Sequence, residues 1–159
     1  MQARIDFQKA VPEGLKLLLA FQPYFKNQPG LEPALLNLVF VRASQINGCA
    51  PCIDMHTKDA RALGETEQRL YGLSAWREAP FYTDREQAAL AWTEAVTLVS
   101  ETHVPDEVFE QAREHFTDKE LANLTLAITQ INTWNRLNVA FRTVAGNYKP
   151  EVEQMKRSA

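Results

Sequence analysis

The two cysteines of the chain lie two residues apart in INGCAPCIDMHTKDARALG, residues 46–64. The spacing of Cys49 and Cys52 lets two sulfurs meet, so that one can attack a peroxide or a disulfide and the other can resolve the product. His56 follows four residues after Cys52, which on a helix places both side chains on one face. An imidazole there can accept the thiol proton, stabilise the thiolate or protonate a departing alkoxide.

A metal site and plain core packing are the alternatives to redox chemistry. Cys49, Cys52 and His56 are legitimate zinc ligands, but a closed zinc site needs a fourth. Only His103 and His115 remain as nitrogen donors, and the chain has no second pair of cysteines. Redox chemistry is therefore favoured over a structural zinc site, and no cofactor or bound metal is expected. Inert packing of two thiols remains open.

Which sulfur would react with peroxide is a separate question. Pro51 suits the first turn of a helix, where unpaired backbone N–H groups and the helix dipole favour a thiolate over a thiol. This effect acts most strongly on Cys49. His56, four residues further along, favours Cys52 instead. The residues alone leave both assignments open.

Helical periodicity dominates the sequence before the cysteines. In residues 31–47, LEPALLNLVFVRASQIN, a row of side chains recurs at the spacing of one helical face, and Arg42 is its single polar member. The members of this row are Leu35, Leu38, Val39, Arg42 and Ile46. Asn47 and Gly48 are predicted to end the helix.

The segment with the cysteines is itself predicted to be a helix over residues 51–63, with Gly64 as a left-handed C-cap. Three more helix starts are marked by their first-turn chemistry. They are the capping-box pairs Thr83 with Glu86 and Thr117 with Glu120, and Pro105 with its two following acids. No alternating run is flanked by hairpin turns, so the fold class is predicted to be all-α.

Composition limits the classes of function. Apolar residues make up 45% and charged residues 23% of the 159 residues, as is usual for soluble globular proteins. A net charge of -3 and a pI near 5.6 argue against binding to nucleic acid. The longest apolar stretches, LLLAF and ALLNLVFV, fall far short of the ~20 residues that a membrane span needs. We expect a cytoplasmic protein without a membrane span, where a close cysteine pair is more often redox-active or metal-binding than a permanent staple.

The segment ASQINGCAPCIDMHTKDARALG, residues 43–64, resembles the core signature of the AhpD-like alkylhydroperoxidases, within the carboxymuconolactone decarboxylase superfamily. That signature is a helix, then N-G-C-x-x-C-x-x-x-H, then a helix that ends in glycine. The likeness is strong over residues 35–64 and continues more weakly over residues 64–97.

The resemblance implies a fold and an activity. The fold is a single-domain helical bundle over residues 1–159, with about six to eight helices, an N-terminal arm over residues 1–11 and a C-terminal tail over residues 147–159. Such proteins assemble into homo-oligomers, trimers or hexamers. They reduce organic hydroperoxides in antioxidant defence, and a dithiol donor such as a lipoyl-bearing protein re-reduces the cysteine pair.

The resemblance also assigns roles to matching positions. Cys49 and Cys52 are the two catalytic thiols, and His56 is the relay histidine. Cys52 becomes the sulfenic acid and Cys49 resolves it, so the resemblance favours Cys52 as the attacking sulfur. Two positions depart from the family pattern. Asn37 stands where a glutamate feeds the proton relay, twelve residues before the first cysteine, and Pro51 replaces a histidine between the cysteines.

The departure at Asn37 means that the relay is impaired or that another carboxylate supplies it. Glu94 lies in LAWTEAVTL, beside an apolar helical face and without a capping role, whereas Glu86 is explained as a cap. Glu94 is therefore the predicted acid/base, and a solvated or salt-bridged helix residue is the alternative. A thiol–disulfide exchanger and a redox-sensing protein are the alternatives to a peroxidase, because both would form the same disulfide.

Overall fold

Helix α4 (Pro33–Ile46) is the element around which the other long helices are arranged. The computed structural model describes residues 2–26 and 30–150. Eight of the fourteen residues of α4 are buried. They are Leu35, Leu36, Asn37, Leu38, Val39, Val41, Ala43 and Ser44. The sequence pattern predicted one buried face, but α5, α7 and α10 all pack against this helix and bury it on several sides.

The described residues contain eight α-helices of six residues or more and no strand, so the predicted all-α class is confirmed. The eight are α2 (Pro12–Leu19), α3 (Phe21–Lys26), α4, α5 (Ala50–Ala62), α6 (Glu67–Gly72), α7 (Asp84–Thr97), α9 (Asp106–Arg113) and α10 (Asp118–Phe141). Three shorter segments are α1 (Phe7–Ala10), α8 (Val99–Thr102) and the 3-10 turn η1 (Leu73–Ala75). Much of the predicted C-terminal tail, residues 151–159, lies outside the described residues.

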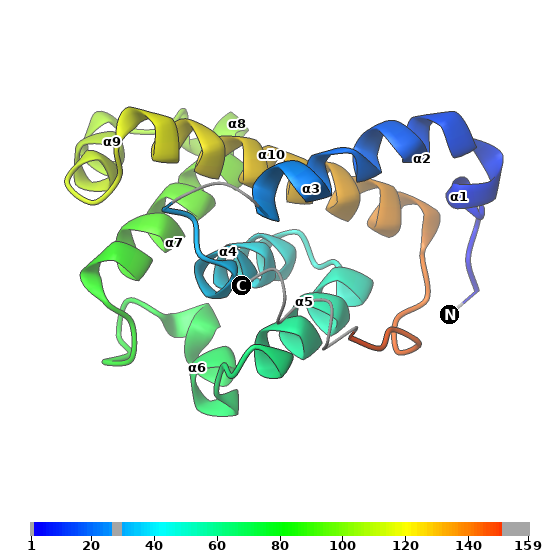
Figure 1. The fold of residues 1–159 in the computed structure, drawn as a ribbon, viewed down its shortest axis with the longest axis horizontal. Helices are drawn as coiled ribbons and strands as arrows, with labels where there is room; N and C mark the ends of the chain where they lie inside the picture. The colour runs from blue at the N-terminus through cyan, green and yellow to red at the C-terminus, as the bar shows by residue number, and fades with distance from the viewer. Residues whose placement is uncertain (1, 27–29, 151–159) are drawn as a thin grey trace.

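Helix α10 runs along one side of the molecule, with α4, α5 and α7 packed beneath it (Figure 1). The N-terminal segment is fastened to the far end of α10. The backbone N–H of Arg4 donates to the carbonyl of Phe141 at 2.8 Å, and its guanidinium donates to the carbonyl of Ala140 at 3.1 Å. The ring of Phe7 lies 5.9 Å from that of Phe141 and 6.3 Å from that of Trp134. The predicted arm therefore packs onto the bundle through α1.

Three apolar clusters fill the interior, and α4 contributes to each of them. Leu35, Leu36 and Val39 belong to a large cluster with α7, α9 and α10, and Leu38 and Val41 belong to a second with α6 and α7. The third, the cysteine cluster, consists of Ala43, Cys49, Cys52 and Ile131. The cysteine pair is thus built into the core through the last turns of α4.

Helices α7 and α10 begin as predicted. Thr83 accepts from the backbone N–H of Glu86, whose carboxylate accepts in return from the N–H of Thr83, and Thr117 and Glu120 do the same. Each capping box satisfies backbone donors that the first helical turn leaves unpaired. Both predicted capping boxes are confirmed.

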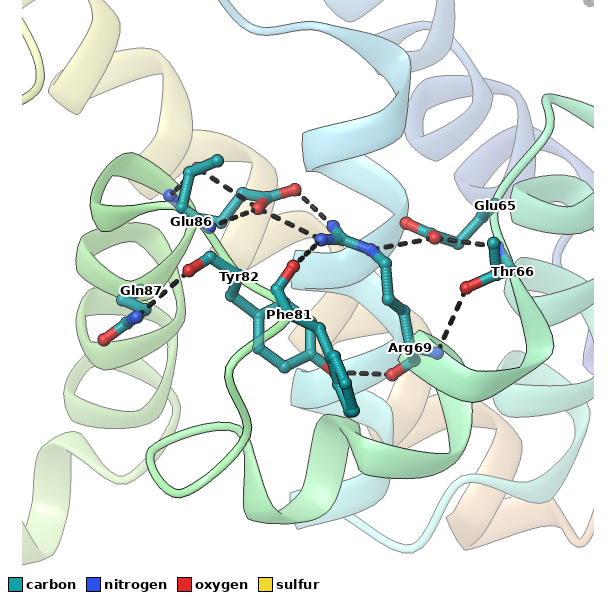
Figure 2. Close-up of polar contacts among 8 residues, drawn as sticks. Glu65, Thr66, Arg69, Phe81, Tyr82, Glu86 and Gln87 are labelled. Atoms are coloured by element: carbon teal, nitrogen blue, oxygen red, sulfur yellow. Dashed lines mark hydrogen bonds and ion pairs between the residues drawn. The ribbon is translucent and has the colours of Figure 1, made fainter.

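A group of ion pairs fastens α6 to the start of α7. Arg69 lies between Glu65 and Glu86, and Figure 2 shows its guanidinium reaching both carboxylates. The same guanidinium donates to the carbonyl of Phe81, and the hydroxyl of Tyr82 donates to the carbonyl of Arg69. We call Glu65, Arg69 and Glu86 the α6–α7 ion cluster. Glu86 therefore has a second role beyond its cap.

None of the helices in the described ranges combines the length and the apolar character that a membrane span requires.

Candidate active site

The turn between α4 and α5 sets the position of Cys49. Gly48 has φ of +65°, in the left-handed region that favours glycine, and so ends α4 as predicted. The backbone N–H of Cys49 then donates to the carbonyl of Ser44 at 2.9 Å, and that of Gly48 donates to Gln45 at 3.3 Å. These bonds close the last turn of α4. As a result Cys49 is the N-cap residue of α5.

Helix α5 presents the second cysteine in its first turn. The helix begins at Ala50, one residue before the predicted start, and Pro51 occupies a position where a backbone N–H is not needed. The predicted cap at Gly64 is confirmed, because this residue has φ of +101° and the N–H of Glu65 returns to the carbonyl of Ala60 at 2.9 Å. Both ends of the helix are therefore fixed by local sequence.

Cys49 and Cys52 form a disulfide, with their Cα atoms 5.4 Å apart, a distance usual for such a bond. Both side chains are buried, at 0% and 2% exposure. The partly buried rings of Phe40 and Trp134 pack against their cluster. The two sulfurs thus meet as the spacing predicts, inside the protein rather than on its surface.

His56 follows one turn later on α5. Its ring lies 4.8 Å from that of Phe40, and its Nδ1 is buried without a hydrogen-bond partner among the described residues. Burial lowers the pKa of His56 from 6.5 to about 4, because desolvation disfavours the charged imidazolium. The ring is therefore neutral at pH 7. A buried polar atom without a partner is rare, so this nitrogen requires an explanation.

A network of amide and hydroxyl side chains links α10 to the turn that carries the cysteines. The amide of Asn47 donates to the Oδ1 atoms of Asn132 and Asn135, each at 2.9 Å. Asn135 donates to the hydroxyl of Ser44 at 3.0 Å. One turn later, Nδ2 of Asn138 donates to Sγ of Cys52 at 3.4 Å.

Sequence reasoning missed this network, although a signal was present. Asn132, Asn135 and Asn138 recur every third residue in a long helix, which places them along one face. Asparagine is a poor helix former, so three asparagines on one face of a helix indicate that their side chains form hydrogen bonds with a neighbouring element.

Glu94 lies on α7 within a separate set of contacts. Its carboxylate accepts from Nε of Arg42 and from Nε1 of Trp76, both at 2.8 Å, and from Arg77. Burial alone would raise the pKa of this carboxyl, but the hydrogen bonds from Trp76, Arg77 and Arg42 outweigh it and hold the pKa below its usual range. In the described part of the chain, Glu94 makes no hydrogen bond or ion pair with His56 or either cysteine.

The position of the missing family acid is buried. Asn37 is 7% exposed on α4, three residues before Phe40, whose ring contacts that of His56. An uncharged amide therefore occupies that site. Within residues 2–26 and 30–150, no three of histidine, cysteine, aspartate and glutamate gather as a metal would require.

The model of the carboxymuconolactone decarboxylase family matches residues 12–95, which include both cysteines, His56 and Glu94. The chain belongs to this family. It is 45% identical to the uncharacterized protein YdfG of Bacillus subtilis (strain 168) over 140 aligned residues. The alignment covers 88% of this chain and 95% of YdfG.

Solved structures agree with this family membership. The fold is similar to that of ATU0492 from Agrobacterium tumefaciens, a protein of unknown function named as a candidate antioxidant defence protein AhpD. The TM-score is 0.87 and the identity 46%, over 92% of this chain and 100% of that one. It is also similar to the alkylhydroperoxidase AhpD core of an uncharacterized peroxidase-related protein from Ralstonia eutropha JMP134. There the TM-score is 0.78 and the identity 19%, over 89% and 75% of the two chains. The predicted AhpD-like membership is confirmed.

Proposed function

We propose that the protein is a thiol-dependent peroxidase that reduces organic hydroperoxides with Cys49 and Cys52. The observation that carries this proposal is the meeting of the two cysteines at the start of α5. His56 follows one helical turn after Cys52, and its Nδ1 is buried with no hydrogen-bond partner among the described residues. Membership of a family with AhpD-like relatives supports the same reaction class.

The reaction begins with the pair reduced. The thiolate of Cys52 attacks one peroxide oxygen, the O–O bond breaks, and the products are a Cys52 sulfenic acid and an alkoxide. The thiol of Cys49 then attacks the sulfenic sulfur, which forms the disulfide and releases water. His56, uncharged at pH 7, accepts the thiol proton of Cys52 and returns it to the alkoxide, which leaves as the alcohol.

A dithiol closes the cycle by two exchange steps that return both cysteines to thiols. One hydroperoxide and one dithiol thus yield one alcohol, one water and one oxidised donor. A lipoyl group is a suitable donor class because it is a slender dithiol on a flexible arm, and Cys52 is only 2% exposed. Assembly into a trimer or hexamer, a cytoplasmic location and a single domain over residues 1–159 remain part of this proposal.

The predicted role of Glu94 as the acid/base of the relay also stays a prediction. Its carboxylate already holds Arg42, Trp76 and Arg77, and these donors keep it ionised at pH 7. An ionised carboxylate cannot act as the acid that protonates an alkoxide. The contacts therefore favour the alternative interpretation of a salt-bridged helix residue.

Turnover with a supplied dithiol tests the proposal. The reduced protein, mixed with cumene hydroperoxide and a dihydrolipoyl donor, should consume peroxide and dithiol in equal amounts over many cycles. Mass spectrometry after a single equivalent of peroxide should show the loss of two hydrogens. Persistent free thiols would contradict the redox chemistry, and zinc that resists removal without unfolding would favour the structural site.

The same assay separates the two remaining functions. An exchanger would reduce a protein disulfide without peroxide, and a sensor would cycle once and then change its assembly or partner. The burial of both sulfurs argues against an exchanger, because a folded partner disulfide must reach a sulfur directly. We therefore expect repeated peroxide turnover and little exchange with protein disulfides.

A further inference from the structure

We propose that Asn138 holds the thiolate of Cys52 in the reduced protein and so makes Cys52, rather than Cys49, the sulfur that attacks peroxide. The inference deepens the proposed function, on which its catalytic meaning rests. It concerns a residue of α10, 86 positions along the chain from Cys52, outside the segment that carries the family motif.

The contact singles out one sulfur. Nδ2 of Asn138 lies 3.4 Å from Sγ of Cys52, a hydrogen-bonding distance for an atom as large as sulfur. Among the hydrogen bonds found for the described residues, it is the one that a side chain donates to either sulfur. The two cysteines therefore have different surroundings, because Sγ of Cys52 has a neutral hydrogen-bond donor from Asn138 beside it.

Hydrogen bonds on both sides of Asn138 along the chain hold its part of α10 in place. Its backbone carbonyl accepts from the N–H of Thr143 at 2.9 Å, at the point where Arg142 adopts a left-handed conformation and ends α10. Three residues earlier, Asn135 is bonded to Ser44 and Asn47 at the cysteine turn. The bonds of Asn135 fix the register of α10 against the last turn of α4 and the turn that leads to Cys49, and so set the position of the Asn138 backbone.

The charged side chains of α5, and Arg42 and Arg136 on the neighbouring helices, already have hydrogen-bond or ion-pair partners. On α4, Arg42 pairs with Glu94, and on the adjoining part of α10, Arg136 donates to Asn132. The charges on α5 itself are also engaged. Asp54 pairs with Lys58, Asp59 accepts from Tyr148, and Arg61 pairs with Glu67. His56 is uncharged at pH 7 until it takes the thiol proton of Cys52.

A thiolate at Cys52 is therefore stabilised by the start of α5 and by the Asn138 amide. A hydrogen bond to the charged form of a group favours that form and lowers its pKa. Before peroxide attack, the amide supplies part of the stabilisation that a neighbouring cation gives in other reactive cysteines. No proton moves to or from Asn138 in this step.

The test is a thiol titration in the Cys49→Ser protein, where Cys52 alone ionises. Ultraviolet thiolate absorbance and the rate of iodoacetamide alkylation against pH both report its pKa. Asn138→Ala should raise the pKa of Cys52 and slow alkylation at neutral pH by roughly 3- to 10-fold, since tenfold corresponds to about one pKa unit. Asn138→Asp should raise the pKa further, because a carboxylate repels the thiolate.

The matched control is Val139→Ala, at the exposed next position on α10, which should leave the pKa of Cys52 unchanged. Asn138→Gln keeps an amide and should recover part of the shift. An unchanged titration curve in Asn138→Ala, with the helical circular dichroism of the parent, would overturn the proposal. If the alanine variant does not fold, the nearly isosteric Asn138→Asp variant provides the test. An unshifted pKa of Cys52 in that variant would also contradict the proposal.

This outcome is independent of the proposed function. The titration needs neither peroxide nor dithiol turnover, so a shifted pKa in a protein without peroxidase activity supports the role of Asn138 and rejects only the peroxidase. In the protein with both cysteines, Asn138→Ala should also lower the rate of peroxide reduction and move its pH profile to higher pH. A lower rate with an unmoved profile would assign Asn138 a structural role instead.

Discussion

Partly buried polar side chains are paired in different ways on the two sides of α4. Toward α6 and α7, charges neutralise each other directly. Arg69 lies between Glu65 and Glu86, and Arg42 pairs with Glu94. Toward α5 and α10, the contacts to the cysteine turn come from uncharged groups, such as the amides of Asn47 and Asn138. The contacts toward α6 and α7 are thus ion pairs, whereas the contacts that reach the cysteine turn itself are hydrogen bonds between neutral side chains.

This difference between ion pairs and neutral hydrogen bonds indicates where a new charge, such as a thiolate, can form. An ion pair is already neutralised, and adding or removing a charge there breaks a partnership. A site of amides beside a helix start has donors ready but no resident opposite charge. A thiolate at Cys52 can form there without displacing one. Asn37, at the position where the resemblance expects a glutamate, is likewise an uncharged amide on a buried part of α4.

The largest expected effect separates the two sulfurs. Cys52→Ser should reduce hydroperoxide turnover to the uncatalysed background, because it removes the attacking thiolate. Cys49→Ser should still react once, to give a sulfenic acid that dimedone traps and mass spectrometry detects. Trapping at Cys49 in the Cys52→Ser protein, at the same rate, would reverse the assignment.

Lowering the pH should reduce the free energy of unfolding, because His56 is buried in its neutral form. Its folded-state pKa of about 4 lies below its ordinary 6.5, so the unfolded chain binds the proton first and acid favours unfolding. The stability attached to neutral His56, up to about 3 kcal/mol, is present above pH 6.5 and is lost as the pH falls to about 4.

Urea unfolding at a series of pH values checks this prediction in the wild type and in His56→Gln. The variant should lose less stability than the wild type over that pH window. Parallel curves would mean that His56 titrates normally in the folded protein, and that its buried nitrogen costs nothing.

Glu94→Gln tests the ionic side. The variant loses the charge that holds Arg42 and Arg77, and we expect unfolding to become easier by about 2 kcal/mol, the scale of hydrogen bonds to charged groups. Peroxide turnover per folded molecule should change by less than tenfold. A loss of ~10²-fold, the scale of one acid–base group, would restore Glu94 to the proton relay. In that case Asn37→Glu should partly rescue the variant.

The smallest expected effect compares the two capping boxes. Glu86→Gln and Glu120→Gln both keep a side chain able to cap, since glutamine also serves at that position. Glu86 additionally pairs with Arg69 in the α6–α7 ion cluster, whereas Arg85 approaches Glu120 only to 3.4 Å. Glu86→Gln should therefore cost about 1 kcal/mol, and Glu120→Gln less than ~0.5 kcal/mol. Equal losses in thermal unfolding would show that Arg69 adds nothing.

Local chemistry explains which features could be predicted from the sequence. The helix boundaries at Gly48, Gly64, Thr83 and Thr117 follow from side chains that act on their own backbone neighbours, and all four are confirmed. The meeting of the cysteines follows in the same way from the spacing of two residues in one turn.

Contacts between distant segments could not be predicted with the same rules. Glu94 was singled out because it had no local explanation, and its explanation is Arg42, 52 residues away. Arg42 was itself the single polar residue in an apolar row of α4. The ion pair between Arg42 and Glu94 therefore explains why each of these charged residues lies where it does. Asn138 carries no local signal that relates it to Cys52, because its contact depends on how α10 lies across α5.

Trp134 gives the protein an optical reporter of its own chemistry. The indole packs against the cysteine cluster, and a disulfide close to an excited indole quenches its emission by accepting an electron. Trp76 and Trp92 are bonded elsewhere, to Glu94 and Thr125, and so supply a steady background. Reduction should brighten the unlabelled protein and each peroxide should dim it again. Under the proposed cycle, the emission of Trp134 should therefore report the balance between hydroperoxide and dithiol in solution.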